Sequence, residues 1–439
     1  MSFFVPVSPP LLDEASAPIL RRAFDHARRI GNYVLVQAAV QLIAFSSGIL
    51  IVRWLPQREY AYFTIANAMQ ATLMLLADIG VGVGLVSIGG RVWQDRDRLG
   101  ELIKTGLAVR KKLAAVAALI VAPILYAMLS KNGASSIYTL LLIGVVLAGF
   151  SIQISVDIFS VVPRLRSDIG LIQKIDFICA TVRLLLILGL VYLFAIAGLA
   201  VAIASATFLL QYLLLRSYAA KVVDLKANQN AEDRREIVRL IKSLAANTLF
   251  YCFQGQITVF LISFFGRHAA SVAEVGALGR LAMIFTVLTN LLINIFVPAF
   301  ARCQDRRKLR WLYATIVGGV VLFSLVVLGG AVFLPDQFLF VLGNRYTHLH
   351  RELLLMIGVA VVTALSGTLW LLNASKAWIA GAWLYIPLTL TTQIALIPFT
   401  DFSSVAGVLI FNLISVVPSL LLNLALSYRG FRTFATAAG

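Results

Sequence analysis

The stretch IYTLLLIGVVLAGFSIQISVDIFSV (137–161) decides the class of this chain, because it carries a single charged residue, Asp157, in an otherwise uncharged and mainly apolar run. A helix needs about 20 mainly apolar residues to cross a bilayer. Similar runs recur along the chain, and 60% of all residues are hydrophobic while only 13% are charged. The mean hydropathy is +0.91, and soluble domains carry about 25% charged residues. We predict an all-α polytopic membrane protein with twelve spans, near 32–52, 61–84, 113–130, 137–161, 171–193, 195–215, 243–264, 275–298, 311–334, 353–373, 377–397 and 404–426.

Positive charge lies almost entirely in alternate connections between these spans. The basic clusters fall in 21–29, 91–112, 216–242 and 302–310, whereas the other connections hold few Lys or Arg residues. Cytoplasmic loops of membrane proteins are enriched in Lys and Arg, so we predict that both termini are cytoplasmic. The net charge of +17 then reflects topology and attraction to an anionic inner leaflet, and we expect no nucleic-acid partner.

The longest polar interruption divides the spans into six and six. We predict an N-terminal tail (1–31), an N-lobe (32–215), a cytoplasmic linker (216–242), a C-lobe (243–426) and a C-terminal tail (427–439). Residues 18–31 are expected either to form an amphipathic helix on the membrane surface or to be a disordered tail. The same spacing separates Asn32 from Asn247 and Glu59 from Glu274, which suits two parallel repeats.

Many spans carry polar residues three or four positions apart, which places them on one face of a helix. Unsatisfied polar groups are costly in hydrocarbon, so stripes of this kind on several helices predict a hydrated central cavity; helix packing through hydrogen bonds is the alternative for any single residue. The predicted cavity residues are Gln37, Gln41, Asn67, Gln70, Asn247, Tyr251, Gln254, Asn290 and Asn294, and the last span adds the stripe Asn412, Ser415, Ser419 and Asn423.

Four charged residues fall within or near the predicted spans and are functional candidates, since charge at mid-membrane costs at least 2.5–3.5 kcal/mol. Arg183 and Arg280 are predicted to line the cavity, although each could instead extend along its helix to a membrane surface. Asp78 and Asp157 lie toward the cytoplasmic ends of their helices. They are expected to balance Arg183, to carry H⁺ or bind Na⁺, or to pair with Lys or Arg of the inner loops.

The sequence contains no recognisable catalytic or metal-binding pattern. It has no Walker A loop, and the pair His348 and His350 has no nearby Cys or third ligand, so we expect no metal site. The cysteines Cys179, Cys252 and Cys303 lie in spans or an inner connection and predict no disulfide. We therefore expect neither an enzyme nor a bound cofactor, apart from coupling to H⁺ or Na⁺.

Three strings resemble a known group. IVRWLPQREYAYF (51–63), LLADIGVGVGL (75–85) and FLFVLGNRYTHLHRELLLMIG (338–358) are similar to motifs of the polysaccharide-transporter branch, the Wzx-type oligosaccharide flippases, of the MOP superfamily. With the twelve-span layout, the resemblance covers essentially the whole chain. Gln57 stands where that branch commonly has an acidic residue, and Ala61 stands where glycine is usual.

The resemblance implies two six-helix lobes in a V around a central cavity that opens alternately to either side. It implies a flippase of the bacterial inner membrane that moves undecaprenyl-diphosphate-linked oligosaccharides from the inner to the outer leaflet during exopolysaccharide, O-antigen or capsule synthesis. Expected partners are this lipid-linked substrate, membrane lipids, and polymerase or export proteins of the same pathway. The alternatives are a cation-coupled small-molecule exporter of the same superfamily and a membrane glycosyltransferase or polysaccharide polymerase.

Overall fold

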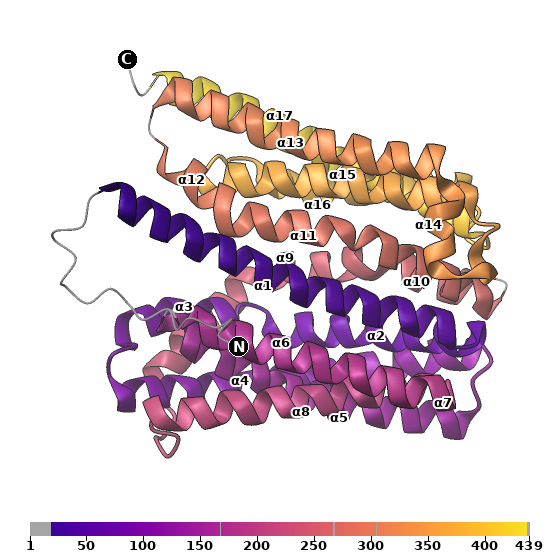
Figure 1. Cartoon of the computed structure of the whole chain (residues 1–439), viewed down its shortest axis with the longest axis horizontal. Coiled ribbons are helices and arrows are strands. Elements are labelled where there is room, and N and C mark those ends of the chain that lie inside the picture. Colours follow the sequence, from indigo (N-terminus) through magenta and orange to yellow (C-terminus); the bar gives the residue numbers. More distant parts are fainter. Residues whose placement is uncertain (1–18, 167, 267, 304, 437–439) are drawn as a thin grey trace. The chain divides into compact units, whose positions relative to one another are not determined.

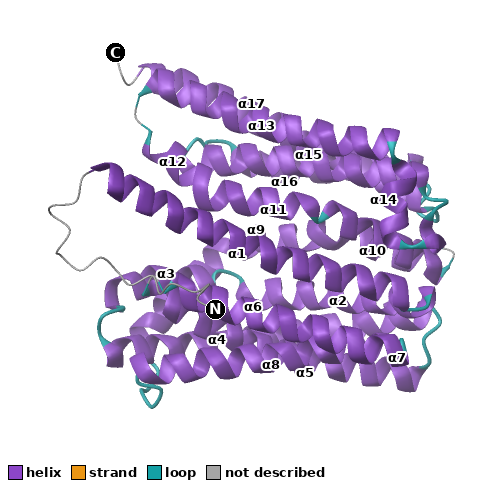
Figure 2. Cartoon of the chain, in the orientation of Figure 1, coloured by secondary structure: helices purple, strands orange, loops and turns teal. Residues whose placement is uncertain are grey.

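The computed structural model describes residues 19–166, 168–266, 268–303 and 305–436, without the side chains of 19–34, 169, 294–295 and 434–436. Within these ranges the chain is helical and contains no β-strand (Figure 2). Eleven helices are long and apolar enough to cross a membrane, or twelve if one bent pair forms a single span. The chain is thus a multi-pass helical membrane protein, as predicted. It divides into two compact units, Met1–Gln256 and Ile257–Gly439.

The first unit contains six spans and the start of a seventh (Figure 1). Its helices are α1 (Ile19–Trp54), α2 (Gln57–Asp78), α3 (Val81–Val92), α4 (Arg96–Lys131), α5 (Ser136–Leu165), α6 (Ile169–Leu186), η1 (Ile187–Val191), α7 (Tyr192–Phe194), α8 (Ala197–Val222) and most of α9 (Ala231–Phe265).

The second unit begins within α9 and contains the remaining spans. Its helices are α10 (Ala269–Ala282), α11 (Ile284–Leu291), η2 (Leu292–Phe296), α12 (Val297–Arg302), α13 (Arg306–Phe333), α14 (Pro335–Leu342), η3 (Asn344–Tyr346), α15 (His350–Ser375), η4 (Ala382–Leu384), α16 (Tyr385–Leu396), η5 (Ile397–Phe399) and α17 (Val405–Thr436).

The helices extend well beyond the apolar runs that predicted them. α1 begins at Ile19, so the described part of the predicted N-terminal tail is helical and continuous with the first span. α4 begins at Arg96 rather than near residue 113, because the Asp95 carboxylate accepts hydrogen bonds from the backbone N–H groups of Asp97 and Arg98 and caps the helix there. The predicted linker consists of the end of α8, a connection over 223–230 and the first turns of α9.

The connection 223–230 lies on the start of α4. The backbone N–H of Asp224 donates to the carbonyl of Arg96 over 3.1 Å. The backbone N–H of Asn230 donates to the Thr105 hydroxyl over 2.8 Å, and its side-chain amide donates to Glu101 over 3.0 Å. The Arg98 guanidinium then pairs with Asp233 of α9 over 3.1 Å. Carboxylates of α4 and α9 thus balance the Arg98 guanidinium.

The second span of the first unit is broken. α2 and α3 are bent by 46° relative to each other, and the break lies at Gly80, whose φ of +86° is in the left-handed region that glycine adopts without strain. The Asp78 carboxylate accepts from the backbone N–H of Gly82 over 3.1 Å and so satisfies a donor at the start of α3.

A repeat that the sequence analysis missed appears at the third span of each unit. The strings QDRDRL (94–99) and QDRRKL (304–309) each precede or open a long helix. In each, the aspartate caps the helix: Asp305 accepts from the backbone N–H groups of Arg307 and Lys308 at 2.7 and 3.1 Å, as Asp95 does in α4. The leucines Leu99 and Leu309 are both fully buried. The two units therefore share a helix start.

The principal helix contact of each unit also repeats. α5 packs mainly on α8 in the first unit, and α15 packs mainly on α17 in the second. Small residues permit the close approach of α5 and α8, since a Cβ atom built at Gly149 would lie 2.2 Å from the Ser205 Oγ atom. Gly144 of the same helix has open space around it.

We predict that Gly149→Leu destabilises the first unit, whereas Gly144→Leu does not. The larger side chain at position 149 must separate α5 from α8, and overpacking of this kind typically costs about 1–3 kcal/mol. Equilibrium unfolding in mixed detergent micelles measures the difference between the two variants. Equal stabilities would show that α5 and α8 do not depend on this contact.

Candidate functional site

A buried arginine holds both of the predicted inner carboxylates. Arg110 of α4 has a side chain that is only 4% exposed, and its guanidinium lies 2.7 Å from Asp157 of α5 and 3.9 Å from Asp78 of α2. Because a buried charge needs a partner in a low-dielectric environment, this group joins three helices. Of the alternatives that the sequence left open, the geometry brings Asp78 and Asp157 to an arginine that had been counted among the inner loops.

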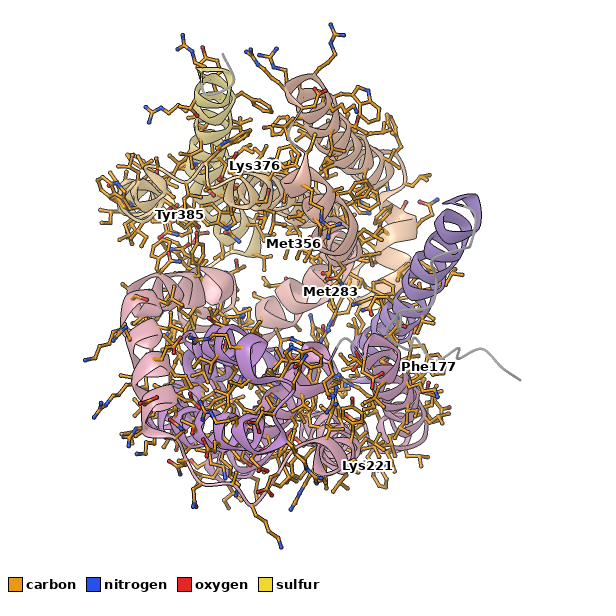
Figure 3. All side chains as sticks on the ribbon, turned by 90° about the vertical axis from the view of Figure 1, so that its left-hand side faces the viewer. Phe177, Lys221, Met283, Met356, Lys376 and Tyr385 are labelled. Atoms are coloured by element: carbon orange, nitrogen blue, oxygen red, sulfur yellow. The ribbon has the colours of Figure 1, made fainter. Side chains whose placement is uncertain are left out.

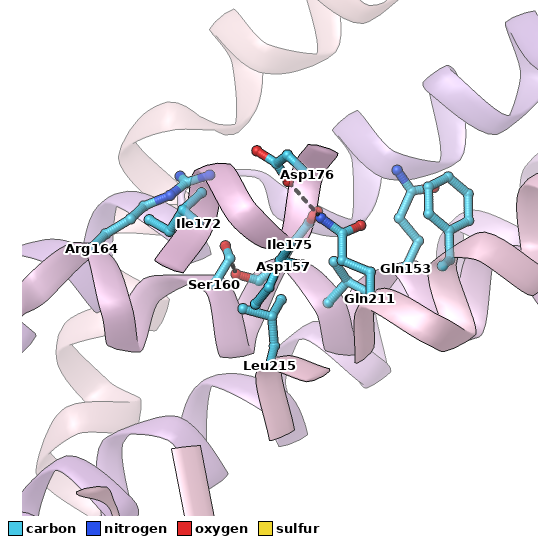
Figure 4. Close-up of a pocket in the computed structure, with 11 residues that line it drawn as sticks. Gln153, Asp157, Ser160, Arg164, Ile172, Ile175, Asp176, Gln211 and Leu215 are labelled. Carbon is cyan, nitrogen blue, oxygen red and sulfur yellow. Dashed lines mark hydrogen bonds between the residues drawn. The ribbon is translucent and has the colours of Figure 1, made fainter. Parts of the chain in front are cut away.

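A small polar cavity adjoins this group. It encloses about 100 Å³, which is room for several water molecules. Gln153, Asp157, Ser160 and Arg164 of α5 line one side (Figure 4). Asp176 of α6 and Gln211 of α8 line the other, and the Gln211 amide donates to the Asp176 carboxylate over 3.1 Å. Asp157 thus touches both the buried guanidinium and a cavity that can hold water.

The predicted cavity residue Gln70 belongs to the same region. Its side-chain amide on α2 donates to the side-chain oxygen of Gln153 on α5 over 3.0 Å, and Gln153 lines the cavity. Gln70, Gln153, Asp157, Asp78 and Arg110 therefore form a continuous series of polar side chains along α2, α4 and α5. We refer to these five residues as the inner polar cluster.

Arg183 lies at a local irregularity of its span. It occupies the last turns of α6, and the π-helical segment η1 (187–191) follows directly. Its side chain is partly buried. π-Helical turns are rare overall, but those that occur are often found at functional sites. The π-helical segment next to Arg183 therefore supports Arg183 as a candidate functional residue.

The second unit also has a π-helical segment, η2 (292–296), within a span. Arg280 lies in the last turn of α10, partly buried, with a guanidinium nitrogen 3.6 Å from the Met283 sulfur. Asn290 is partly buried and lies two residues before η2. Asn294 lies within η2, where its side chain is outside the described part of the structure.

The other predicted cavity residues lie on α1, α2 and α9 of the first unit. Gln37, Gln41 and Gln254 are partly buried, whereas Asn67, Asn247 and Tyr251 are exposed, with Tyr251 at 41%. Of the predicted residues, Asp78 and Asp157 are therefore joined through Arg110, and Gln70 is hydrogen-bonded to Gln153. The remaining predicted residues are distributed over α1, α2, α6, α9, α10, α11 and η2.

The polar stripe of the last span was expected to line a cavity, but half of it packs between helices instead. Ser419 and Asn423 of α17 are buried against α15, where the Ser366 and Ser419 hydroxyls lie 2.6 Å apart and the Asn423 amide donates to Ser366 over 3.2 Å. Asn373 of α15 donates to the Asn423 carbonyl over 2.9 Å. This part of the prediction was wrong, because interhelical hydrogen bonds satisfy the same polar atoms that water would.

The repeated glutamates lie at corresponding starts of the second spans. Glu59 accepts hydrogen bonds from the Tyr138 hydroxyl over 2.7 Å and from the Ala197 backbone N–H over 2.8 Å, which ties α2 to α5 and to the start of α8. Glu274 of α10 lies 3.5 Å from His348. His350 lies 2.9 Å from Asp336, and the described residues contain no group of ligands that could hold a metal.

Arg110, Arg164 and Gln211 belong to this site but were not among the predicted site residues. Arg110 was placed in a loop because the apolar run of its span begins only near residue 113, whereas α4 begins at Arg96. Gln211 is a polar residue within an otherwise apolar span, which was the available signal. Hydropathy alone cannot reveal that a charged turn continues a helix into the protein interior.

These features define a polytopic helical protein with two compact units, and comparison with solved structures shows that its fold is that of the MOP-superfamily transporters. The lipid II flippase MurJ in an inward closed conformation matches with a TM-score of 0.72 at 10% identity, over 92% of this chain and 90% of that one. An inward-facing multidrug resistance MATE transporter of the MOP superfamily matches with a TM-score of 0.64 at 14% identity, over 92% and 100%.

A third solved structure agrees. It is a MOP-superfamily transporter from Pyrococcus furiosus, with a TM-score of 0.56 at 16% identity over 90% of this chain and 94% of that one. No protein-family signature matches the chain, and no curated protein matches it in sequence. The likeness therefore establishes the fold, in agreement with the superfamily resemblance drawn from the three sequence strings.

We predict that Arg110→Gln destabilises the protein by about 1–3 kcal/mol. Loss of one partner of a buried ion pair typically costs 3–5 kcal/mol, and partial exposure of both carboxylates, at 41% and 40%, reduces that cost. Adding Asp157→Asn should recover part of the loss in a double-mutant cycle measured by unfolding in mixed micelles. Arg91→Gln is the matched control, because its ion pair with Glu236 is exposed and should contribute under 1 kcal/mol. Strictly additive effects would mean that Arg110 and Asp157 do not interact.

Proposed function

We propose that this chain is a flippase that moves undecaprenyl-diphosphate-linked oligosaccharides from the inner to the outer leaflet of a bacterial inner membrane by alternating access. The observation that carries the proposal is the fold shared with MurJ, a lipid II flippase, over nine-tenths of both chains. The resemblance of three sequence strings to the Wzx-type branch supports the choice of a lipid-linked oligosaccharide. The chain would then act as a transporter rather than as an enzyme.

The substrate chemistry fits the partly buried cations of the spans. A diphosphate needs fixed positive charge, and arginine suits it because the guanidinium donates two parallel hydrogen bonds to phosphate oxygens. Arg183 and Arg280 are partly buried cations within spans, and we assign them this role. A glycan needs hydrogen-bonding side chains, which Gln37, Gln41, Asn247, Gln254 and Asn290 can provide.

A cation-coupled small-molecule exporter is the second candidate, because MATE transporters share the fold as well. A cavity for organic cations would require unbalanced acidic groups. In the first unit the carboxylates Asp78 and Asp157 lie against Arg110 instead, which reduces their attraction for a cationic ligand. The partly buried arginines favour an anionic substrate, so we rank the flippase first.

We expect Arg183→Ala and Arg280→Ala each to lower the rate of export of the lipid-linked saccharide by about tenfold to a hundredfold. Each hydrogen-bonded contact with a charged group contributes about 1.5–3 kcal/mol. In cells that lack the chromosomal gene, the variants are compared by surface polysaccharide and by lipid-linked saccharide retained on the inner leaflet, at equal protein level in the membrane. Arg351→Ala is the control, since Arg351 is exposed at the start of α15.

Full export by both single variants and by the double variant would remove these arginines from the mechanism. Accumulation of a cationic dye in the deletion strain, with unchanged polysaccharide, would instead support the exporter.

The inner polar cluster offers a place for coupling to H⁺ or Na⁺. Asp157 has one oxygen 2.7 Å from Arg110 and also lines the polar cavity, so a proton or a sodium ion that enters with water can compete with the guanidinium for this carboxylate. Protonation or sodium binding would break the ion pair between Arg110 of α4 and Asp157 of α5. The packing of these two helices would then depend on whether the ion is bound.

We predict that Asp157→Asn abolishes the response of transport to an imposed pH or sodium gradient in proteoliposomes while leaving gradient-independent exchange measurable. Asp168→Asn serves as the control, because Asp168 at the start of α6 pairs with the Tyr218 hydroxyl over 2.8 Å and lies outside the cluster. An unchanged response to both gradients in Asp157→Asn would exclude this carboxylate as the coupling group.

A further inference from the structure

The starts of α4 and α13 correspond in sequence, but their charges differ. If QDRDRL (94–99) is aligned with QDRRKL (304–309), Asp97 corresponds to Arg307 and Glu101 corresponds to Trp311. The local backbone pattern is kept beyond these strings: Thr105 donates to the Glu101 carbonyl over 2.7 Å, and Thr315 donates to the Trp311 carbonyl over 2.9 Å. The second copy has therefore replaced both carboxylates of the first, one by a cation and one by an aromatic residue.

The carboxylates of the first copy neutralise its cations. Arg98 pairs with Glu101 and with Asp233, and Arg91 pairs with Glu236 over 2.6 Å. The connection 223–230 and the first turns of α9 cover this helix start, as described above. In the first unit, then, Arg91 and Arg98 are engaged by carboxylates of the protein itself.

The corresponding end of the second unit is basic. We call it the basic end, and it consists of Arg302 of α12, Arg306, Arg307, Lys308 and Arg310 of α13, Lys376 after α15, and Arg429 and Arg432 of α17. Asp305 is the one carboxylate residue in 297–315, 368–381 and 420–436. Among the described residues, none of the seven arginine and lysine side chains on α12, α13 and α17 forms an ion pair with a carboxylate. Asp305 itself is engaged, because backbone hydrogen bonds from Arg307 and Lys308 cap α13 and hold the pKa of its carboxyl below the usual value.

A rigid aromatic cluster holds these helix ends together. The Phe431 ring of α17 lies 5.0 Å from Tyr313 of α13 and 4.8 Å from Trp378, and Trp378 contacts Phe300 of α12 at 6.2 Å between ring centres. The Lys376 ammonium donates to the carbonyls of Ala301 and Cys303 over 2.9 and 2.6 Å, which joins the end of α15 to the end of α12. Figure 3 looks onto this end of the helices, where nitrogen-tipped side chains project outward from α13 and α17, and it labels Lys376. The basic side chains thus extend from helix ends that aromatic contacts and hydrogen bonds join to one another.

Exposed aromatic side chains accompany the cations. Trp311 is 68% exposed one residue after Arg310, and Tyr428 is 63% exposed with the Arg432 guanidinium 5.5 Å from its ring centre. Tryptophan and tyrosine are enriched where a membrane protein crosses the headgroup region, and clusters of Lys and Arg at that level attract anionic lipids by about 1 kcal/mol per residue. The enrichment of cytoplasmic loops in Lys and Arg would explain the positive charge alone. It does not explain why both carboxylates are replaced, why Trp311 is present, or why the arginines and lysines of α12, α13 and α17 form no ion pairs among the described residues.

We propose that the basic end of the second unit is a binding surface for the headgroups of anionic phospholipids of the cytoplasmic leaflet. Arg306, Arg310 and Arg432 would bind the phosphate, and Trp311 and Tyr428 would lie at the level of the glycerol and upper acyl chains. This surface is independent of the transported substrate. The first unit has no equivalent, because Arg96 donates to the Ala220 carbonyl, Arg98 pairs with Glu101 and Asp233, and Gly100 stands where the second unit has Arg310.

Quenching of tryptophan fluorescence tests the proposal. The full-length protein in phosphatidylcholine nanodiscs is prepared with increasing fractions of brominated phosphatidylglycerol or, separately, brominated phosphatidylcholine. We expect a saturable component of quenching with phosphatidylglycerol alone, and we expect Trp311→Phe to remove it. Arg306→Gln/Arg310→Gln should weaken the apparent affinity on the order of tenfold to thirtyfold, since each charge contributes about fivefold.

The matched control is Arg345→Gln/Arg351→Gln, which removes two exposed cations from the same unit outside the basic end and should change the affinity less than twofold. Equal quenching by the two lipids, or unchanged phosphatidylglycerol affinity in the Arg306→Gln/Arg310→Gln variant, would overturn the proposal. Displacement of the lipid by micromolar pyrophosphate would overturn it as well, because the surface would then bind a soluble phosphate compound. None of these readouts depends on transport, so their failure is separate from failure of the proposed flippase activity.

Discussion

The ion pair between Arg110 and the carboxylates of Asp157 and Asp78 is the interaction on which the first unit most depends. Hydrocarbon offers no solvent for an isolated charge, so a buried guanidinium fixes the positions of the helices that supply its partners. The same carboxylates have further tasks: Asp78 caps α3 across the break at Gly80, and Asp157 faces the polar cavity. A single charged group thereby joins the helix break, the helix packing and the proposed ion-coupling site. We therefore expect a change of protonation at Asp157 to affect the helix break, the packing of the three helices and the proposed ion-coupling site.

The fold was largely predictable from hydropathy, because a bilayer demands apolar runs of nearly fixed length. All twelve predicted spans coincide with helices, but the basic segments expected to connect them lie largely within helices, such as 96–112 in α4. Helix limits were not predictable in the same way. Asp95 extends α4 far into a charged segment that hydropathy assigns to a loop, and the π-helical segments at 187–191 and 292–296 leave no compositional trace. Local capping and local backbone geometry decide these features.

The candidate site was only partly predictable, for a related reason. A polar residue in a span has to be satisfied, but the sequence does not say by what. Asp157 pairs with Arg110, and Gln70 donates a hydrogen bond to Gln153. Asn423 instead donates to Ser366 in a buried contact between two helices, although its spacing in the sequence is the same as that expected for a residue lining a cavity. The spacing of polar residues shows that they share one face of a helix. Whether that face contacts water or a neighbouring helix depends on how the helices pack. The helix starts at Asp95 and Asp305 give a second example. The two aspartates cap their helices in the same way, but the residues that follow them differ in charge.

The boundary between the two units falls inside α9, between Gln256 and Ile257, and not in a loop. The two units are therefore joined by continuous helical backbone at this point. Gly255 adjoins the boundary and has open space where a side chain would lie. A glycine inside a helix lowers its resistance to bending because it allows a wider range of backbone angles, so the part of α9 beside the boundary is the part that bends at the lowest cost.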